Sequence, residues 1–149
     1  MRPYIHKVQY YETDMMGVVH HANYIRWMEE ARIDYMDQLG FPYTEMERKG
    51  VLSPVKALSC EYRHSCTFGD EIAVTVRAES FNGVVMAIGY RMENGQGETV
   101  CKARSEYVFL DRSGHFVRMK RDMPEFCAAI EASMEKNGPE QETPPHPSR

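Results

Sequence analysis

Residues 23–40, NYIRWMEEARIDYMDQLG, carry the most regular apolar pattern in this chain of 149 residues. The apolar positions recur every three or four residues, and they are Tyr24, Met28, Ala31, Tyr35 and Leu39. This spacing places them on one stripe of an α-helix that faces a core. Asn23 is a suitable N-cap, Gly40 is a suitable C′ residue, and Pro42 prevents continuation. The pattern therefore predicts a helix over residues 23–39.

The segments on either side of this helix alternate apolar and polar residues, as half-buried strands do. We expect strands over residues 4–11, 55–62, 71–80, 84–92 and 99–110. In the first strand, the even-numbered residues from Tyr4 to Tyr10 share the inward face. The turn sequences NG, at residues 82–83, and NGQG, at residues 94–97, adopt positive φ at little cost. Consecutive strands should therefore pair antiparallel.

One striped helix and about five strands bury their apolar faces most economically together. The pattern thus predicts an α+β fold in which a curved antiparallel sheet wraps around one long central helix. Residues 43–49 and 123–136 should add a short and a terminal helix. We expect one domain over residues 1–136. Residues 137–149 contain four of the eight prolines, and we expect them to form a disordered tail.

Composition excludes several classes of protein. The net charge of −4 and the pI near 5.9 argue against binding to nucleic acid. No apolar run approaches the ~18 residues that span a bilayer, and the N-terminus lacks a signal-peptide core, so we expect a cytoplasmic protein. The four cysteines form no C-x-x-C pair, which favours reduced thiols over a disulfide or zinc site. No G-x-S-x-G, G-x-G-x-x-G or P-loop motif is present.

The candidate site is the segment YYETDMMGVVHHAN, residues 10–23, which joins the first strand to the long helix. The first N–H groups of a helix lack intrahelical partners and carry partial positive charge, so they can stabilise an oxyanion. Asp14 is the one carboxylate in residues 13–24, and we take it as the candidate nucleophile or general base. The alternative is that Asp14 only caps a local turn.

Other residues of this segment leave two interpretations open. Tyr10 could either pack in the core or lie near Asp14, and Gly17 would let a ligand approach closely. For His20 and His21 the simplest expectation is one surface ring and one buried ring. A metal site would need further ligands, and no H-x-x-x-H spacing exists, so we expect no metal.

A basic trio follows the last strand, at residues 118, 120 and 121. Its simplest interpretation is a solvated edge. In the alternative interpretation, Arg118 contacts a phosphate of a nucleotide-bearing substrate.

Residues 10–24, followed by EEAR at 29–32 and LG at 39–40, resemble the hotdog-fold acyl-CoA thioesterases of the 4-hydroxybenzoyl-CoA thioesterase and YbgC type. The resemblance continues through EYR at 61–63, FGDEI at 68–72 and FLD at 109–111 to Pro124. It implies a helix wrapped by an antiparallel sheet, dimers or tetramers with active sites at the dimer interface, and no metal or cofactor. The departure is Met15-Met16, where the family commonly has a small residue or proline.

By position, Asp14 matches the catalytic aspartate of this family, and the backbone N–H of His21 matches the amide that polarises the thioester carbonyl. Tyr10 and His21 match the additional tyrosine and histidine of the YbgC-like branch. The intervening Gly17, Val18 and Val19 are then candidate substrate-binding residues.

The resemblance implies hydrolysis of a small or medium acyl-CoA thioester to free acid and CoA by a homodimer or homotetramer. Two alternatives remain open. One is an acyl-thioester dehydratase or hydratase with His21 as base, and the other is a module that binds an acyl carrier protein without turnover. The acyl group and its carrier, coenzyme A or acyl carrier protein, are not specified by the sequence.

Overall fold

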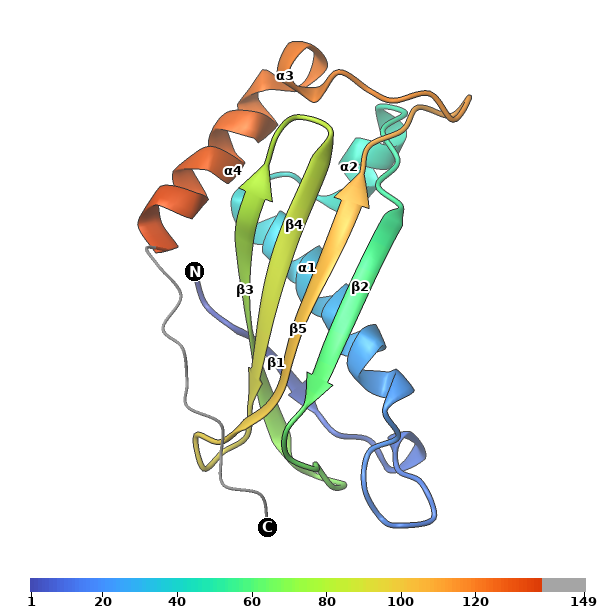
Figure 1. The fold of residues 1–149 in the computed structure, drawn as a ribbon, viewed down its shortest axis with the longest axis vertical. Helices are drawn as coiled ribbons and strands as arrows, with labels where there is room; N and C mark the ends of the chain where they lie inside the picture. The colour runs from blue at the N-terminus through green and yellow to red at the C-terminus, as the bar shows by residue number, and fades with distance from the viewer. Residues whose placement is uncertain (138–149) are drawn as a thin grey trace.

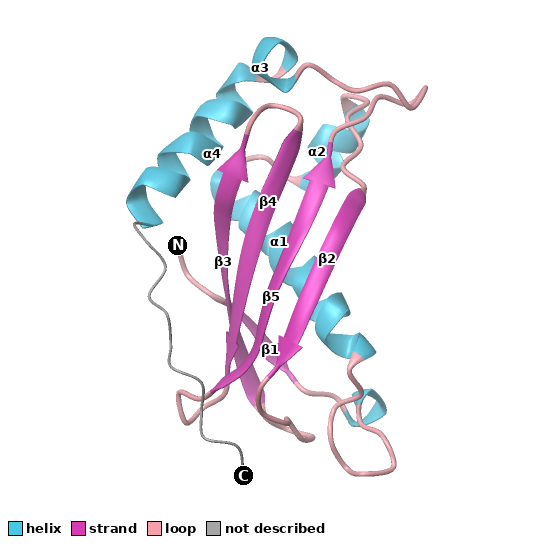
Figure 2. Ribbon diagram, viewed as in Figure 1, coloured by secondary structure: helices cyan, strands magenta, loops and turns pink. Residues whose placement is uncertain are grey.

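The protein forms a five-stranded antiparallel sheet with helices packed against it (Figures 1 and 2). The computed structural model describes residues 1–137, so the expected tail lies outside the described residues except for Asn137. The strands are β1 (Tyr4–Lys7), β2 (Val55–Tyr62), β3 (Glu71–Phe81), β4 (Val85–Glu93) and β5 (Thr99–Val108). The helices are η1 (Tyr10–Glu12), α1 (Ala22–Leu39), α2 (Tyr43–Arg48), α3 (Met119–Asp122) and α4 (Pro124–Asn137).

The strands lie in the order β1-β3-β4-β5-β2, and every neighbouring pair is antiparallel. Both expected hairpins are present, with Gly83 and Gly97 at φ values of +88° and +77°. The register places Val76 opposite Tyr90 and Tyr90 opposite Ala103. Strand β2 lies at one edge of the sheet and pairs only with β5 among the described strands.

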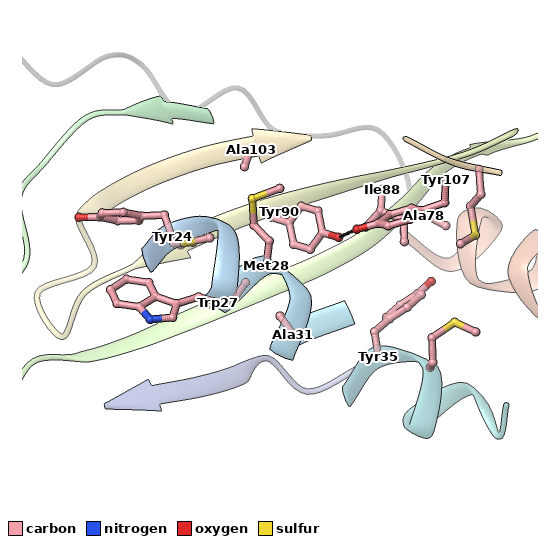
Figure 3. Packing of buried hydrophobic residues seen from close by; sticks show 14 of the residues in the cluster. Tyr24, Trp27, Met28, Ala31, Tyr35, Ala78, Ile88, Tyr90, Ala103 and Tyr107 are labelled. Carbon is pink, nitrogen blue, oxygen red and sulfur yellow. Dashed lines mark hydrogen bonds between the residues drawn. The ribbon is translucent and has the colours of Figure 1, made fainter. Parts of the chain in front are cut away.

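Helix α1 lies behind the sheet, and its apolar stripe points towards the strands (Figures 1 and 3). Tyr24, Met28, Ala31 and Tyr35 are buried as predicted, and Leu39 packs against the same core. The helix ends at Leu39, and the left-handed backbone of the next residue, Gly40 (φ +88°), closes the last turn.

The predicted N-cap was wrong. Helix α1 begins at Ala22, with His21 in the capping position. Asn23 is therefore the second residue of the helix, and its side-chain Nδ2 donates to the carbonyl of Glu12 at 2.9 Å.

The terminal helix α4 also packs on the sheet, against β3 (Figure 1). Phe126 and Ile130 are buried, and the Tyr35 hydroxyl lies 2.8 Å from Ser133 Oγ, which connects α1 to α4. The short α3 was not predicted. The architecture is therefore α+β, with two helices of several turns against an antiparallel sheet.

The first strand is shorter than its alternation suggested. Val8 is buried on the expected face, but β1 ends at Lys7 and the chain turns into η1. Two hydrogen bonds hold this turn: the N–H of Gln9 donates to Glu12 Oε1 at 2.8 Å, and the N–H of Glu12 donates to the carbonyl of Gln9 at 3.0 Å. Tyr10 is consequently 77% exposed and does not lie on an inward strand face.

Within residues 1–137, no helix is long and apolar enough to cross a membrane.

Candidate active site

Residues 13–20 form a tight loop between η1 and α1. Thr13 and Val19 pair as an isolated β-bridge, and the N–H of Asp14 donates to the carbonyl of Val18 at 2.9 Å. Gly17 supplies the positive φ (+77°) that the turn requires. The loop is also attached to its neighbour, because the N–H of Val19 donates to the carbonyl of Cys66 at 2.9 Å. Asp14 is therefore held opposite Val18, and Val18 lies three residues before His21.

The Asp14 carboxylate is half-buried and partly committed to a local turn. Its Oδ1 accepts a hydrogen bond from the N–H of Met16 at 2.8 Å, so the turn-capping role considered from the sequence is present. Among the described residues, Oδ2 has no hydrogen-bond partner. One oxygen of Asp14 thus fixes the loop, and the other is available for chemistry.

The N-terminus of α1 leaves one amide free. The N–H of Ala22 donates to His20 Nδ1 at 3.2 Å, and the N–H of Asn23 donates to the carbonyl of His20 at 3.0 Å. The N–H of Tyr24 donates to the carbonyl of His21 at 3.3 Å. No described residue accepts a hydrogen bond from the N–H of His21. This amide is the donor that an oxyanion would need.

The two histidine rings do not separate as expected. His20 and His21 are both exposed, and their rings stack with centroids 4.2 Å apart. The prediction of one buried imidazole was wrong because both residues precede the part of α1 that packs on the sheet. Residues 1–137 contain no group of three or more His, Cys, Asp or Glu side chains placed to hold a metal ion.

A shallow hollow of about 310 Å³ opens beside His21. Its lining consists of Val19, His21, Tyr24, Tyr62, Arg63, His64 and Ser65. Tyr62, at the end of β2, donates from its hydroxyl to the carbonyl of His21 at 3.1 Å. Asp14 does not line this hollow. The sequence analysis assigned no role to Tyr62, because nothing in its local pattern links it to a helix 41 residues away.

The remaining site residues are divided by the fold. Gly17, Val18 and Val19 all belong to the loop that carries Asp14, and of these three only Val19 has a buried side chain. Arg118 is exposed and precedes α3, where it lines a separate hollow of about 380 Å³ together with Lys49. Helix α3 lies at the opposite end of the sheet from the start of α1 (Figure 1). A single chain therefore does not bring Arg118 to Asp14.

Glu12 is a buried carboxylate that the sequence analysis missed. Its side chain is 4% exposed, and its oxygens lie 2.8 Å from His6 Nε2 and 2.6 Å from Trp27 Nε1. Burial raises the pKa of the Glu12 carboxyl, but hydrogen bonds from the Gln9 N–H, His6 and Trp27 outweigh burial and leave the pKa below its usual value. One feature of the sequence could have indicated this contact: His6 lies on the inward face of the first strand, six residues before Glu12.

This lowered pKa predicts a pH dependence of stability. As pH falls, the unfolded chain takes up a proton on Glu12 before the folded protein does. The stabilisation is therefore complete above the unfolded pKa of about 4.3 and is lost as pH falls from there through the lower pKa of the folded protein. We expect Glu12→Gln to flatten the fall in the free energy of urea unfolding between about pH 5 and pH 3. Glu131→Gln, at an exposed position of α4, should keep the wild-type slope. Equal slopes for the wild type and Glu12→Gln would contradict this account.

An antiparallel sheet packed on a helix whose first free amide adjoins a carboxylate-bearing loop is the arrangement expected of hotdog-fold thioesterases. Comparison with known proteins agrees with this assignment. Residues 8–132 match the model of the Thioesterase-like superfamily, and the chain belongs to that family.

Two relatives in sequence and one in structure illustrate the family. A candidate acyl-CoA thioesterase of Bacillus subtilis, YneP, is 37% identical over 84% of this chain and 91% of its own length. The acyl-CoA thioester hydrolase YbgC of Escherichia coli O6:H1 is 25% identical over 70% of this chain and 78% of its own length. The crystal structure of a DHNA-CoA thioesterase from Staphylococcus aureus superimposes with a TM-score of 0.87, at 29% identity, over 94% of this chain and 96% of that one.

Proposed function

We propose that this protein is an acyl-CoA thioesterase that hydrolyses a small or medium acyl-CoA thioester to the free acid and CoA. The observation that carries the proposal is the free N–H of His21 at the start of α1, adjoining the loop that presents Asp14 Oδ2. The names of the relatives support the same reaction, since YbgC and the structural neighbour are described as thioester hydrolases of acyl-CoA.

Hydrolysis needs little machinery beyond these two groups. The thioester carbonyl oxygen accepts a hydrogen bond from the N–H of His21 and becomes an oxyanion as the carbon is attacked. Asp14 either removes a proton from the attacking water or attacks the carbon itself, to form an anhydride that water then opens. The C–S bond breaks and CoA leaves as a thiolate, which is easily expelled because the pKa of a thiol is about 8.5. The products are the carboxylic acid and CoA.

The proposal includes a homodimer joined along β2. Every residue of this edge strand except Cys60 is exposed, including Val55, Leu58 and Tyr62. An exposed edge with apolar side chains is a template for pairing with another strand. A hollow of about 230 Å³ between α1 and β2, lined mainly by apolar side chains, adjoins this edge and would be covered by the second copy. A homotetramer would add further contacts elsewhere.

Pairing along β2 would also complete the site. The end of β2 lies at the start of α1, because the Tyr62 hydroxyl contacts His21. Its beginning lies near the segment before α3, because Leu52 pairs with Leu110 and Leu110 pairs with Phe116. Two copies of β2 paired antiparallel therefore place the partner subunit's Arg118 towards the Asp14 loop. In that position a guanidinium could bind a phosphate of CoA.

The wider proposal treats residues 1–136 as one catalytic domain that acts in the cytoplasm. Acyl carrier protein is the alternative acyl carrier, and acyl thioesters of that carrier can be added to the substrate panel.

A thiol-release assay over short-chain, medium-chain, long-chain and aromatic acyl-CoAs tests the proposed function. We expect stoichiometric free acid and CoA from at least one short, medium or aromatic substrate. Formation of a double bond without free thiol would instead establish the dehydratase. Saturable binding of acyl thioesters without any product would establish a binding module.

A further inference from the structure

The backbone carbonyl of Glu12 closes the loop that carries Asp14. It accepts hydrogen bonds from the N–H of His20 at 2.8 Å and from Asn23 Nδ2 at 2.9 Å. Glu12 directly precedes the loop, and His20 is its last residue. Both ends of the loop are thus held at one residue, with Asp14 two positions after Glu12 and His21 one position after His20.

The side chain of Glu12 fixes this junction to the rest of the fold. Oε1 accepts hydrogen bonds from His6 Nε2 and from the N–H of Gln9, both at 2.8 Å, and Oε2 accepts from Trp27 Nε1 at 2.6 Å. His6 comes from β1, and Trp27 comes from the second turn of α1. The indole of Trp27 is fully buried, and the His6 ring packs against it with centroids 4.6 Å apart. Glu12 therefore connects the first strand, the loop and the main helix.

The His6 ring lies between two carboxylates. Nε2 lies 2.8 Å from Glu12 Oε1 of η1, and Nδ1 lies 3.2 Å from Glu30 Oε2 of α1. On the side of the sheet, the residue opposite His6 is Ile72 of β3. A carboxylate can only accept hydrogen bonds, so His6 Nε2 is the donor to Glu12.

We propose that Glu12, held by His6 and Trp27, is the positioning residue that sets the Asp14 carboxylate relative to the His21 amide. This inference rests on the proposed thioesterase function. No hydrogen bond between Asp14 and His21 is present in the described structure, so their separation depends on the base of the loop. The tip of the loop packs little, since Met15 and Met16 are fully or largely exposed, and Gly17 and Val19 are held on the other side by hydrogen bonds to Thr67 and Cys66. A shift of about 1 Å between reacting groups can cost about 100-fold in rate.

The decisive variant is Glu12→Gln, which keeps the shape of the side chain but replaces one acceptor oxygen by an NH₂ group. In one orientation of the amide this NH₂ group faces Trp27 Nε1, and in the other it faces His6 and the N–H of Gln9. In neither orientation can it accept the hydrogen bond that the carboxylate oxygen accepted. We expect kcat to fall about 100-fold while KM changes by less than about threefold, because positioning of the attack is lost rather than substrate binding. Glu131→Gln, on the outer side of α4, should keep the wild-type kcat. A folded Glu12→Gln protein with kcat within about threefold of wild type would overturn the proposal.

Trp27→Phe decides the question if Glu12→Gln does not fold. Phenylalanine keeps an aromatic ring in the core and removes only the N–H that binds Glu12. We expect about a tenfold loss in kcat with KM nearly unchanged, since one of three hydrogen bonds to the carboxylate is lost. Wild-type kcat in a folded Trp27→Phe protein would count against the proposal. Activity of the wild-type protein, with none in Asp14→Ala, shows separately whether the proposed function itself holds.

Discussion

Asp14→Asn is expected to lower kcat by about 10³-fold, with KM within about threefold of wild type. Asparagine has nearly the same shape as aspartate, and its side-chain oxygen can still accept the hydrogen bond that the N–H of Met16 donates at 2.8 Å. The loop should therefore keep its conformation. The amide cannot remove a proton from water or attack a carbonyl, so the chemical step alone should be lost. Steady-state thiol release with the best acyl-CoA of the substrate panel measures the effect.

A matched control is available in the neighbouring loop. Asp70 Oδ2 accepts a hydrogen bond from the N–H of Thr67, three residues earlier, at 2.9 Å, so this carboxylate also binds one backbone N–H of a turn, as Asp14 does with Met16. Asp70→Asn should therefore retain the wild-type kcat. If Asp14→Asn behaved in the same way, Asp14 would be only a cap of its loop, and the proposed mechanism would be wrong.

The parts of the fold that could be predicted from the sequence are those determined by contacts between residues close in the chain. The stripe of α1 reflects a period of 3.6 residues, and the hairpins at Gly83 and Gly97 reflect the ease with which glycine adopts positive φ. Strand β2 was placed with its observed bounds, because both its ends are marked by a change of pattern. The position of Asp14 before a helix N-terminus was also visible in the sequence.

Other features depend on contacts that no local pattern encodes. Glu12 is held by His6 and Trp27, six and fifteen residues away, and this network replaced the end of the expected first strand with η1. The expected inward position of Tyr10 on the first strand was wrong for the same reason. Arg118 directly precedes α3, and α3 lies at the opposite end of the sheet from the start of α1 (Figure 1). The sequence identified Tyr10 and Arg118 as candidates but could not specify which residues they meet, and Glu12 was not among the candidates.

Leu58→Asp is expected to convert the protein to monomers and to lower kcat/KM by at least about 100-fold. Leu58 is 42% exposed on β2 and lines the apolar hollow beside α1. A two-fold interface along β2 would bury the new carboxylate twice, and each unpaired buried charge costs about 3 kcal/mol or more. Sedimentation equilibrium measures the mass of the assembly in solution.

The control is Val84→Asp, at a 45% exposed position in the turn between β3 and β4, which should remain dimeric and active. A dimeric, active Leu58→Asp protein would contradict pairing along β2.

Complementation then tests whether the site is shared between subunits. Asp14→Asn lacks the chemical group, and Arg118→Ala should raise KM about tenfold by removing a charged phosphate contact. In a heterodimer of the two variants, one site combines intact Asp14 with the partner subunit's intact Arg118, whereas the other site lacks both. Co-expression in equal amounts should therefore restore about one quarter of the wild-type kcat/KM. If Arg118 instead served Asp14 of its own chain, no site of the heterodimer would be complete, and the mixture would show only the residual activity of Arg118→Ala. The recovery of activity depends on antiparallel pairing of the two β2 strands. Only that pairing places the end of the sheet near Arg118 in one subunit beside the Asp14 loop of the other subunit.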